Sequence, residues 1–321
     1  MRTAEKNKML ERLDELMPGY ANLFDDLWAA EAPTTLLEVF ATPEAVRLST
    51  TESIKMAVEA RGSLMRWETA AMVRDWAAKA PDPEPECLGA RRVILLDALE
   101  GIRRLSGTIE KYERMMFELL VEDRSVLLVG ARGVNVVSVA SYAAELGPVG
   151  HYLAPKHISG MAGLYPSRSQ SAETDYPDGP IVKARNGRLR DALMELARGL
   201  MRYNEHFAGW ALARRREGWD PLKAQVAIAN RFARISYHVL AGGGAYRHPS
   251  GEGVEAVMPK LLGFAFAKGF KKDEVLMLME KAARQFPPVA MPMEVAALQR
   301  KAKRLVLRGV FDVRRGCILS V

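Results

Sequence analysis

The sequence predicts a mainly α protein. Apolar residues return every three or four positions over long stretches, and proline and glycine fall mostly between those stretches. The alternating apolar and polar runs that are typical of strands do not occur in the first 80 residues. With 321 residues, 49% of them apolar, the chain is long enough for two domains with ample cores.

Residues 1–85 are predicted to form a helical N-terminal region. The predicted helices span residues 8–28, with a break at Pro18–Gly19, then 34–40, one from 43, one from about 51, and 61–80. Thr42 followed by Pro43 is a typical helix start, because threonine caps the first turn and proline suits the first helical position. The proline-rich stretch 81–86 indicates a stiff extended linker.

The segment 86–122 is predicted to be one long amphipathic helix. Between residues 90 and 120 apolar side chains recur at helical spacing with charges between them. Such a length is typical of a coiled coil or a helical hairpin. We therefore expect either a stalk through which the chain forms a homo-oligomer, or a long helix that packs on its own domain.

Residues 123–250 read as a third, helical domain, and residues 251–321 as a C-terminal helical appendage. The predicted elements are a turn at 132–135, helices over 189–203, up to 216, and 221–240, a stop at 242–244, two or three helices over 255–301, and a β-like tail over 305–321. The triplet Arg214–Arg216 is interpreted as a solvated helix end, with a phosphate contact as the alternative.

Charge and cysteine usage narrow the class of partner. The net charge of +7 and the pI near 9.4 favour an acidic partner, for which nucleic acid is the default candidate. Cys87 and Cys317 lie far apart, and no histidine or cysteine pair has the spacing of a metal site, so we expect no metal ligands. The chain shows no secretion signal and no apolar run of membrane-spanning length, which predicts a cytoplasmic protein without membrane contact.

Three serine hydroxyls gather on a turn-like stretch that begins at Gly163. They belong to Ser167, Ser169 and Ser171, and a basic segment opening a helix follows over residues 181–190. A hydroxyl on a loop flanked by fixed cations is suited to attack a phosphodiester, since the cations hold the phosphate and offset its developing charge. On these residues alone, such a turn more often serves simply to connect two elements.

The stretch 133–193 resembles the C-terminal transposase domain of the insertion-sequence family one-ten, the bridge-RNA-guided serine transposases related to the Piv DNA invertases. The resemblance rests on three motifs in the family's order and near its spacing, at residues 133–147, 161–171 and 181–190. It implies a helix-hairpin-helix-like element whose glycine-rich turn offers backbone N–H groups to a phosphate. We expected the turn residue Asn135 to tolerate a left-handed conformation there.

The resemblance also implies roles for individual residues. The family's nucleophilic serine falls on Ser171, which would form a covalent phosphoserine link with DNA. The residues expected to bind nucleic acid are Arg132, Gly133, Arg168, Lys183, Arg185, Asn186, Arg188 and Arg190. Two positions depart from the family pattern, because Ala172 and Arg185 stand where glycines are expected.

The implied function is that of a DNA transposase or recombinase subunit, with DNA and a guide RNA as partners. In the family, Mg²⁺ is held by an N-terminal RuvC-like domain with clustered acidic residues, and nothing before the long helix resembles such a domain. A RuvC-like subunit acting in trans, a decayed and inactive fragment, and a non-catalytic DNA- or RNA-binding protein therefore compete. An interaction scaffold built on the 90–120 helix is a further alternative.

Overall fold

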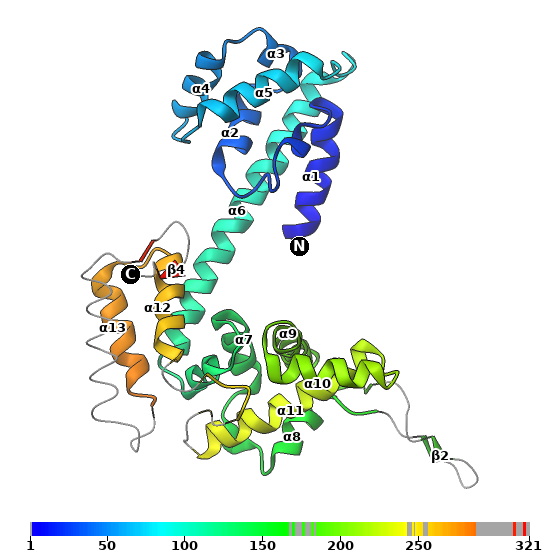
Figure 1. The fold of residues 1–321 in the computed structure, drawn as a ribbon, viewed down its shortest axis with the longest axis vertical. Coiled ribbons are helices and arrows are strands. Elements are labelled where there is room, and N and C mark those ends of the chain that lie inside the picture. Colours follow the sequence, from blue (N-terminus) through cyan, green and yellow to red (C-terminus); the bar gives the residue numbers. More distant parts are fainter. Residues whose placement is uncertain are drawn as a thin grey trace. The chain divides into compact units, whose positions relative to one another are not determined.

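The protein is mainly α, as the sequence predicts (Figure 1). The computed structural model describes residues 2–166, 169–170, 175–176, 181–182, 184–242, 246, 248–252, 256–286, 311–312 and 317–318. The chain forms two compact units, Met1–Glu110 (unit 1) and Lys111–Val321 (unit 2), and the boundary falls within the long helix α6. In the described part of the chain, no helix is both long and apolar enough to cross a membrane.

Unit 1 is built from short helices and the first part of α6. Its elements are α1 (Arg2–Leu16), the 3₁₀ helix η1 (Tyr20–Leu23), α2 (Glu31–Val39), α3 (Pro43–Arg47), α4 (Thr51–Glu59), α5 (Trp67–Lys79) and the start of α6 (Leu88–Leu120). The predicted start of α3 is confirmed, because the Thr42 hydroxyl accepts a hydrogen bond from the Ala45 N–H. The helix predicted from residue 61 begins only at Trp67, since Gly62 takes a left-handed φ of 86° just after α4 ends.

Part of the apolar stripe of α6 is buried in the core of unit 1. Leu95, Leu99 and Ile102 are buried among the side chains of the shorter helices. Val93, which was predicted to share that stripe, is 66% exposed. The helix prediction for residues 90–120 is confirmed, and self-association through it stays a prediction.

Unit 2 holds the remaining elements. They are the end of α6, η2 (Arg124–Gly130), α7 (Val136–Leu146), η3 (Val149–His151), α8 (Pro155–Ala162), β1 (Ser169–Gln170), β2 (Asp175–Tyr176), α9 (Gly187–Tyr203), α10 (Glu205–Arg216), α11 (Pro221–Gly242), α12 (Val257–Ala267), α13 (Lys272–Ala283), β3 (Phe311–Asp312) and β4 (Cys317–Ile318). The strands form two antiparallel pairs, with Ser169 opposite Tyr176 and Phe311 opposite Ile318.

One continuous core fills unit 2. Helix α9 packs against α7, α10 and α11, and its leucine stripe is buried as the periodicity predicts. Helices α12 and α13 contribute Leu261 and Leu278 to this same core. Near the end of α6, the Phe117 ring lies 5.1 Å from that of Phe264 in α12. Helices α12 and α13 therefore pack as part of unit 2, whereas the sequence suggested an appendage.

Candidate nucleic-acid interface

The segment that carries Ser171 leaves the helical body from a fixed exit. Helix α8 ends at Gly163, whose left-handed φ of 68° lets its N–H and that of Leu164 bond back to Gly160 O and Ser159 O. Leu164 is 2% exposed, and its carbonyl accepts a 2.8 Å hydrogen bond from Asn230 Nδ2 in α11. The chain direction at this exit is thus set by both α8 and α11.

The returning chain is bound to the exit. Val182 donates its N–H to Tyr165 O at 3.2 Å, and Pro166 forms a β-bridge with Ile181. The carbonyl of Val182 in turn accepts a 2.9 Å hydrogen bond from Arg190 Nη1 in α9. The two ends of the stretch between these bonds, residues 167–180, which we call the serine segment, are therefore joined at their base.

The asparagine of the third motif joins three helices. Asn186 caps α9, because its Oδ1 accepts a 3.0 Å bond from the Leu189 N–H, and its backbone N–H bonds to Met161 O at the end of α8. Its Nδ2 donates to Glu145 Oε2 in α7 at 3.3 Å. Asn186 and Arg190 thus hold the base of the serine segment, and a contact of either with nucleic acid stays a prediction.

The serine predicted to be the nucleophile lies in a part of the chain that the structure does not describe. Ser171, Arg168 and Lys183 lie outside the described residues. Ser169 and Gln170, which directly precede Ser171, form β1 and pair with β2. Figure 1 shows β2 standing away from the helices of unit 2, beyond the base described above.

Arg185 and Arg188 are two predicted cations whose side chains are exposed in the described structure. Within the described residues neither takes part in an ion pair. Arg188 lines a cavity of about 800 Å³ formed by residues of α6, α7, α9 and α12, and the carboxylates that also line it are Glu113, Glu145, Asp191 and Glu195. Both arginines flank the start of α9, and they follow directly on the returning end of the serine segment. A phosphate contact of either arginine stays a prediction.

Arg132, by contrast, lies among carboxylates. Its Nη1 is 2.8 Å from Glu205 Oε1 and its Nε is 3.8 Å from Glu252 Oε1, while Lys260 also pairs with Glu252 at 2.8 Å. Exposed pairs of this kind contribute at most about 1 kcal/mol of stability. The two glutamates nevertheless neutralise the positive charge of Arg132 that a phosphate would need. The predicted role of Arg132 in binding nucleic acid therefore draws no support from this geometry.

Gly133 serves a close approach between the hairpin turn and α9. It takes the left-handed φ of 85°, and a Cβ built on it would lie 2.7 Å from Gly199 O. A Cβ on Gly199 would in turn lie 2.3 Å from Gly133 O. Asn135, for which left-handed geometry was considered, is extended instead and caps α7 by accepting a bond from Ser138 N–H. Gly133, and not Asn135, therefore supplies the left-handed residue of the turn between η2 and α7, and the resemblance of this element to a helix-hairpin-helix stays a prediction.

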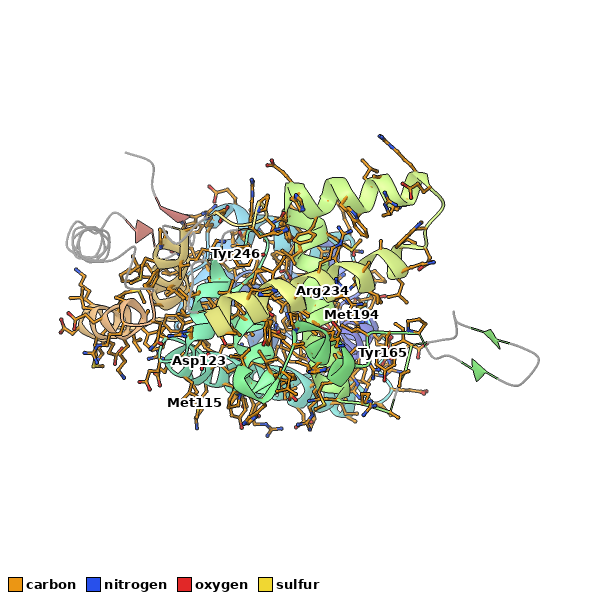
Figure 2. All side chains as sticks on the ribbon, turned by 90° about the horizontal axis from the view of Figure 1, so that it is seen from below. Met115, Asp123, Tyr165, Met194, Arg234 and Tyr246 are labelled. Carbon is orange, nitrogen blue, oxygen red and sulfur yellow. The ribbon has the colours of Figure 1, made fainter. Side chains whose placement is uncertain are left out.

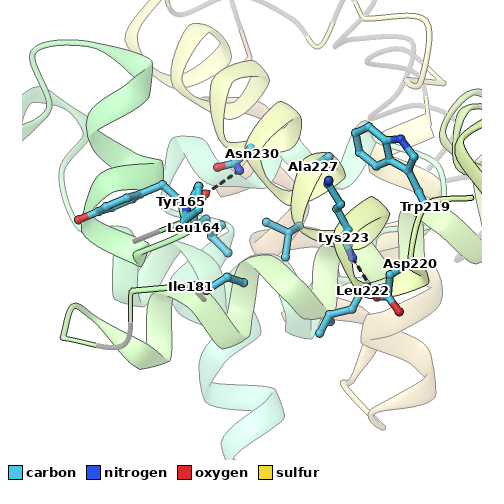
Figure 3. A pocket seen from close by; sticks show the side chains of 11 residues that line it. Leu164, Tyr165, Ile181, Trp219, Asp220, Leu222, Lys223, Ala227 and Asn230 are labelled. Atoms are coloured by element: carbon cyan, nitrogen blue, oxygen red, sulfur yellow. Dashed lines mark hydrogen bonds between the residues drawn. The ribbon is translucent and has the colours of Figure 1, made fainter. Parts of the chain in front are cut away.

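A pocket that sequence reasoning missed opens beside the base of the serine segment (Figure 3). Its volume is about 490 Å³, and its lining is mostly apolar. Leu164 and Tyr165 line it from the exit of the segment, while Trp219 lines it from the loop before α11 and Lys223 from the first turn of α11. Among the described residues, the Oδ1 atom of Asn230 in its wall has no hydrogen-bond partner. The residues come from segments far apart in the chain, so no local pattern signals the pocket.

A histidine pair lies beside the hairpin in unit 2. The rings of His206 and His248 are 4.9 Å apart, and His248 Nδ1 is 2.8 Å from the hydroxyl of Ser250, which also bonds to the Tyr246 hydroxyl. In the described part of the chain, no three histidine, cysteine, aspartate or glutamate side chains gather closely enough to hold a metal ion.

Acidification from about pH 7.5 to about pH 5.5 should destabilise unit 2 through His248. Burial lowers its pKa, and the charges of His206 and Arg231 lower it further, whereas in the unfolded chain it titrates near about 6.5. The unfolded state therefore takes up the proton at a higher pH than the folded state does. The stability that is fully present above about pH 6.5 is lost as the pH falls from there through the lowered pKa of the folded state. Thermal unfolding should show a smaller fall in Tm for His248→Gln than for the wild type. Equal falls would assign the effect to other groups.

Comparison with known proteins identifies this part of the chain. Residues 127–210 match the model of the transposase IS116/IS110/IS902 family. A protein of Sinorhizobium fredii (strain NBRC 101917 / NGR234) that bears the name "Putative transposase y4qE" is 36% identical over 66 residues, which cover 21% of this chain and 17% of that relative. No solved structure matches.

The matched range contains the hairpin turn, Ser171 and the arginines at the start of α9. The resemblance to this family is thus confirmed, while the assignment to the C-terminal part of its members stays a prediction, and the chain is related through residues 127–210 of unit 2 to the transposases of the IS116/IS110/IS902 family.

Proposed function

We propose that this chain is a DNA transposase or recombinase subunit in which Ser171 attacks a DNA phosphodiester. One observation supports this above the others. The serine segment is joined at its base by the Tyr165–Val182 hydrogen bond and held there by Arg190, next to two exposed arginines that make no ion pair within the described residues. A nucleophile is more effective when the two ends of the segment that carries it are fixed before the substrate arrives, because less conformational entropy is then lost in reaching the transition state.

In the proposed reaction the Ser171 Oγ–P bond forms as the P–O bond to the departing sugar oxygen breaks. The hydroxyl proton passes to a general base, and the departing oxygen takes up a proton. Arg185 and Arg188 would offset the charge that develops on the phosphoryl oxygens. The base and Mg²⁺ belong, in this proposal, to a RuvC-like acidic domain that a partner subunit supplies, with a guide RNA selecting the DNA.

Self-association through α6 forms part of the same proposal. After the packing of both units, several apolar side chains of this helix stay exposed, among them Val93, Tyr112 and Leu119. Exposed apolar side chains on one helix can be buried against the same side chains of a second copy, which forms a helix–helix interface. Leu99 is excluded from such an interface, because it is buried in unit 1.

The DNA-binding part of the proposal is tested by the salt dependence of binding. We expect Arg185→Ala/Arg188→Ala to weaken binding of duplex DNA and to lower the slope of log Kd against log[salt] by about 2, because each lost phosphate contact releases about one counterion fewer. Fluorescence anisotropy over a range of salt concentrations measures the slope.

Arg198→Ala supplies the matched control. Arg198 is exposed on the same helix α9, but it is paired with Glu195, so its removal should leave the slope nearly unchanged. If the double variant behaves like this control, the two arginines are only a solvated face, and an interaction scaffold explains the chain better.

A further inference from the structure

Helix α11 carries positive charge without any acidic side chain. None of its 22 residues is aspartate or glutamate, and its cations are Lys223, Arg231 and Arg234. At about 100° per residue these three fall within about 80° of the helix circumference. The opposite face is buried in the core of unit 2. Arg234, which Figure 2 labels on this helix, is exposed.

Between α10 and α11, cations alternate with tryptophan rings. The Lys223 ammonium lies 4.9 Å from the Trp219 ring centre, and the Arg231 guanidinium lies 4.0 Å from that of Trp210. The Arg214 guanidinium lies about equally far from both rings, 5.7 Å from that of Trp219 and 5.8 Å from that of Trp210. The rings themselves are 6.0 Å apart and nearly perpendicular. We call these five residues the basic–aromatic strip.

The strip has little compensating negative charge. Arg214 pairs with Glu217 at 2.6 Å, and among the described residues Lys223 and Arg231 make no ion pair. The pKa of Arg231 is lowered by burial and, in addition, by the neighbouring cations Arg214 and Arg234. Cations that crowd one another in the free protein are stabilised when a polyanion binds between them.

From this arrangement we propose that the basic–aromatic strip binds a single nucleic-acid strand. Unpaired bases stack on the two tryptophan rings, and the phosphates between them bind the strip's cations. A duplex offers its phosphates to such a surface but keeps its base faces covered, so the tryptophans distinguish the two forms. The inference shares its class of partner with the proposed function, but it does not depend on the chemistry of Ser171.

The position of the strip gives the bound strand a direction. Trp219 and Lys223 also line the 490 Å³ pocket whose opposite wall is formed by Leu164 and Tyr165, at the exit of the serine segment. A strand laid along the strip therefore leads from α10 to the base of the segment that carries Ser171. The strip thus places unpaired nucleotides beside the candidate site without contacting Arg185 or Arg188.

The test compares the full-length chain and its variants on oligothymidylate, oligouridylate and a duplex of the same length. We expect Trp210→Leu and Trp219→Leu each to weaken single-strand binding about tenfold or more, since stacking on a ring is lost, while duplex binding changes by less than about threefold. Trp219→Phe, which keeps a flat ring, should retain most of the affinity. Circular dichroism confirms that each variant is folded.

The same experiment separates this inference from the proposed function. Arg185→Ala/Arg188→Ala should weaken duplex binding and leave single-strand binding within about threefold of the wild type. Tighter binding of either oligothymidylate or oligouridylate supports the strip and identifies DNA or RNA as its preferred strand. Single-strand affinities of folded tryptophan variants that equal the wild type would show that the rings only pack α10 against α11, and would overturn the proposal.

Discussion

Replacing Ser171 by alanine should abolish a covalent protein–DNA adduct. The adduct is expected when the chain acts together with a RuvC-like acidic domain and its RNA, because a serine hydroxyl is a poor nucleophile until a base or metal ion activates it. It appears as a band that resists denaturant on electrophoresis with labelled DNA. With the attacking oxygen gone no phosphoserine link can form, so the expected loss is complete, whereas removal of a phosphate-binding arginine only slows the reaction.

Two neighbouring serines provide matched controls. Ser167→Ala and Ser169→Ala remove the same hydroxyl from the same segment, and the adduct should persist in both. If the adduct persisted in Ser171→Ala and disappeared in one of these variants, the nucleophile would be that other serine and not Ser171. The isolated chain, with magnesium alone, should leave supercoiled DNA intact, since both the base and the metal site belong to the partner in the proposed reaction.

Gly199→Ala should strongly destabilise unit 2. A methyl group at this position would stand 2.3 Å from Gly133 O, closer than any ordinary contact, so α9 and the hairpin turn would have to move apart. Overpacking of this kind typically costs about 1–3 kcal/mol. We expect a loss of about 2–3 kcal/mol in the free energy of unfolding of unit 2, measured by urea denaturation followed by circular dichroism.

Gly209→Ala is the matched control on the neighbouring helix α10. A Cβ on Gly209 meets nothing within 4 Å, so this change should stabilise the helix by up to about 1 kcal/mol through its better helix propensity. The two variants are thus expected to shift stability in opposite directions. Equal and favourable shifts would mean that the turn and α9 are not in close contact.

Local patterns allowed much of the helical fold to be predicted. The leucine stripe of α9 and the Thr42 cap of α3 depend only on residues a few positions apart, which sequence spacing reports directly. The packing of residues after 250 on the core of unit 2 was missed, because Leu261 joins that core through contacts with residues far away in the sequence.

The candidate site was predicted less completely for the same reason. The three motifs pointed to Arg132 as a phosphate contact, yet its pairing with Glu205 and Glu252 joins residues more than seventy positions apart. Whether an arginine is free or paired depends on the tertiary fold, and a single sequence does not report it. The contact of Arg231 with Trp210 likewise arises only when α10 and α11 lie side by side, whereas the other cation–tryptophan contacts of the strip join residues four or five positions apart.

The joined base of the serine segment has a consequence for how such a chain can change over generations. Since Tyr165 and Val182 are already hydrogen-bonded to each other, the helical body closes without help from the residues between them. The entropy of closing a loop grows only slowly with its length, so insertions and deletions between these two positions cost the body little. The length of this segment can therefore change within a lineage while the helical scaffold that holds its two ends stays the same.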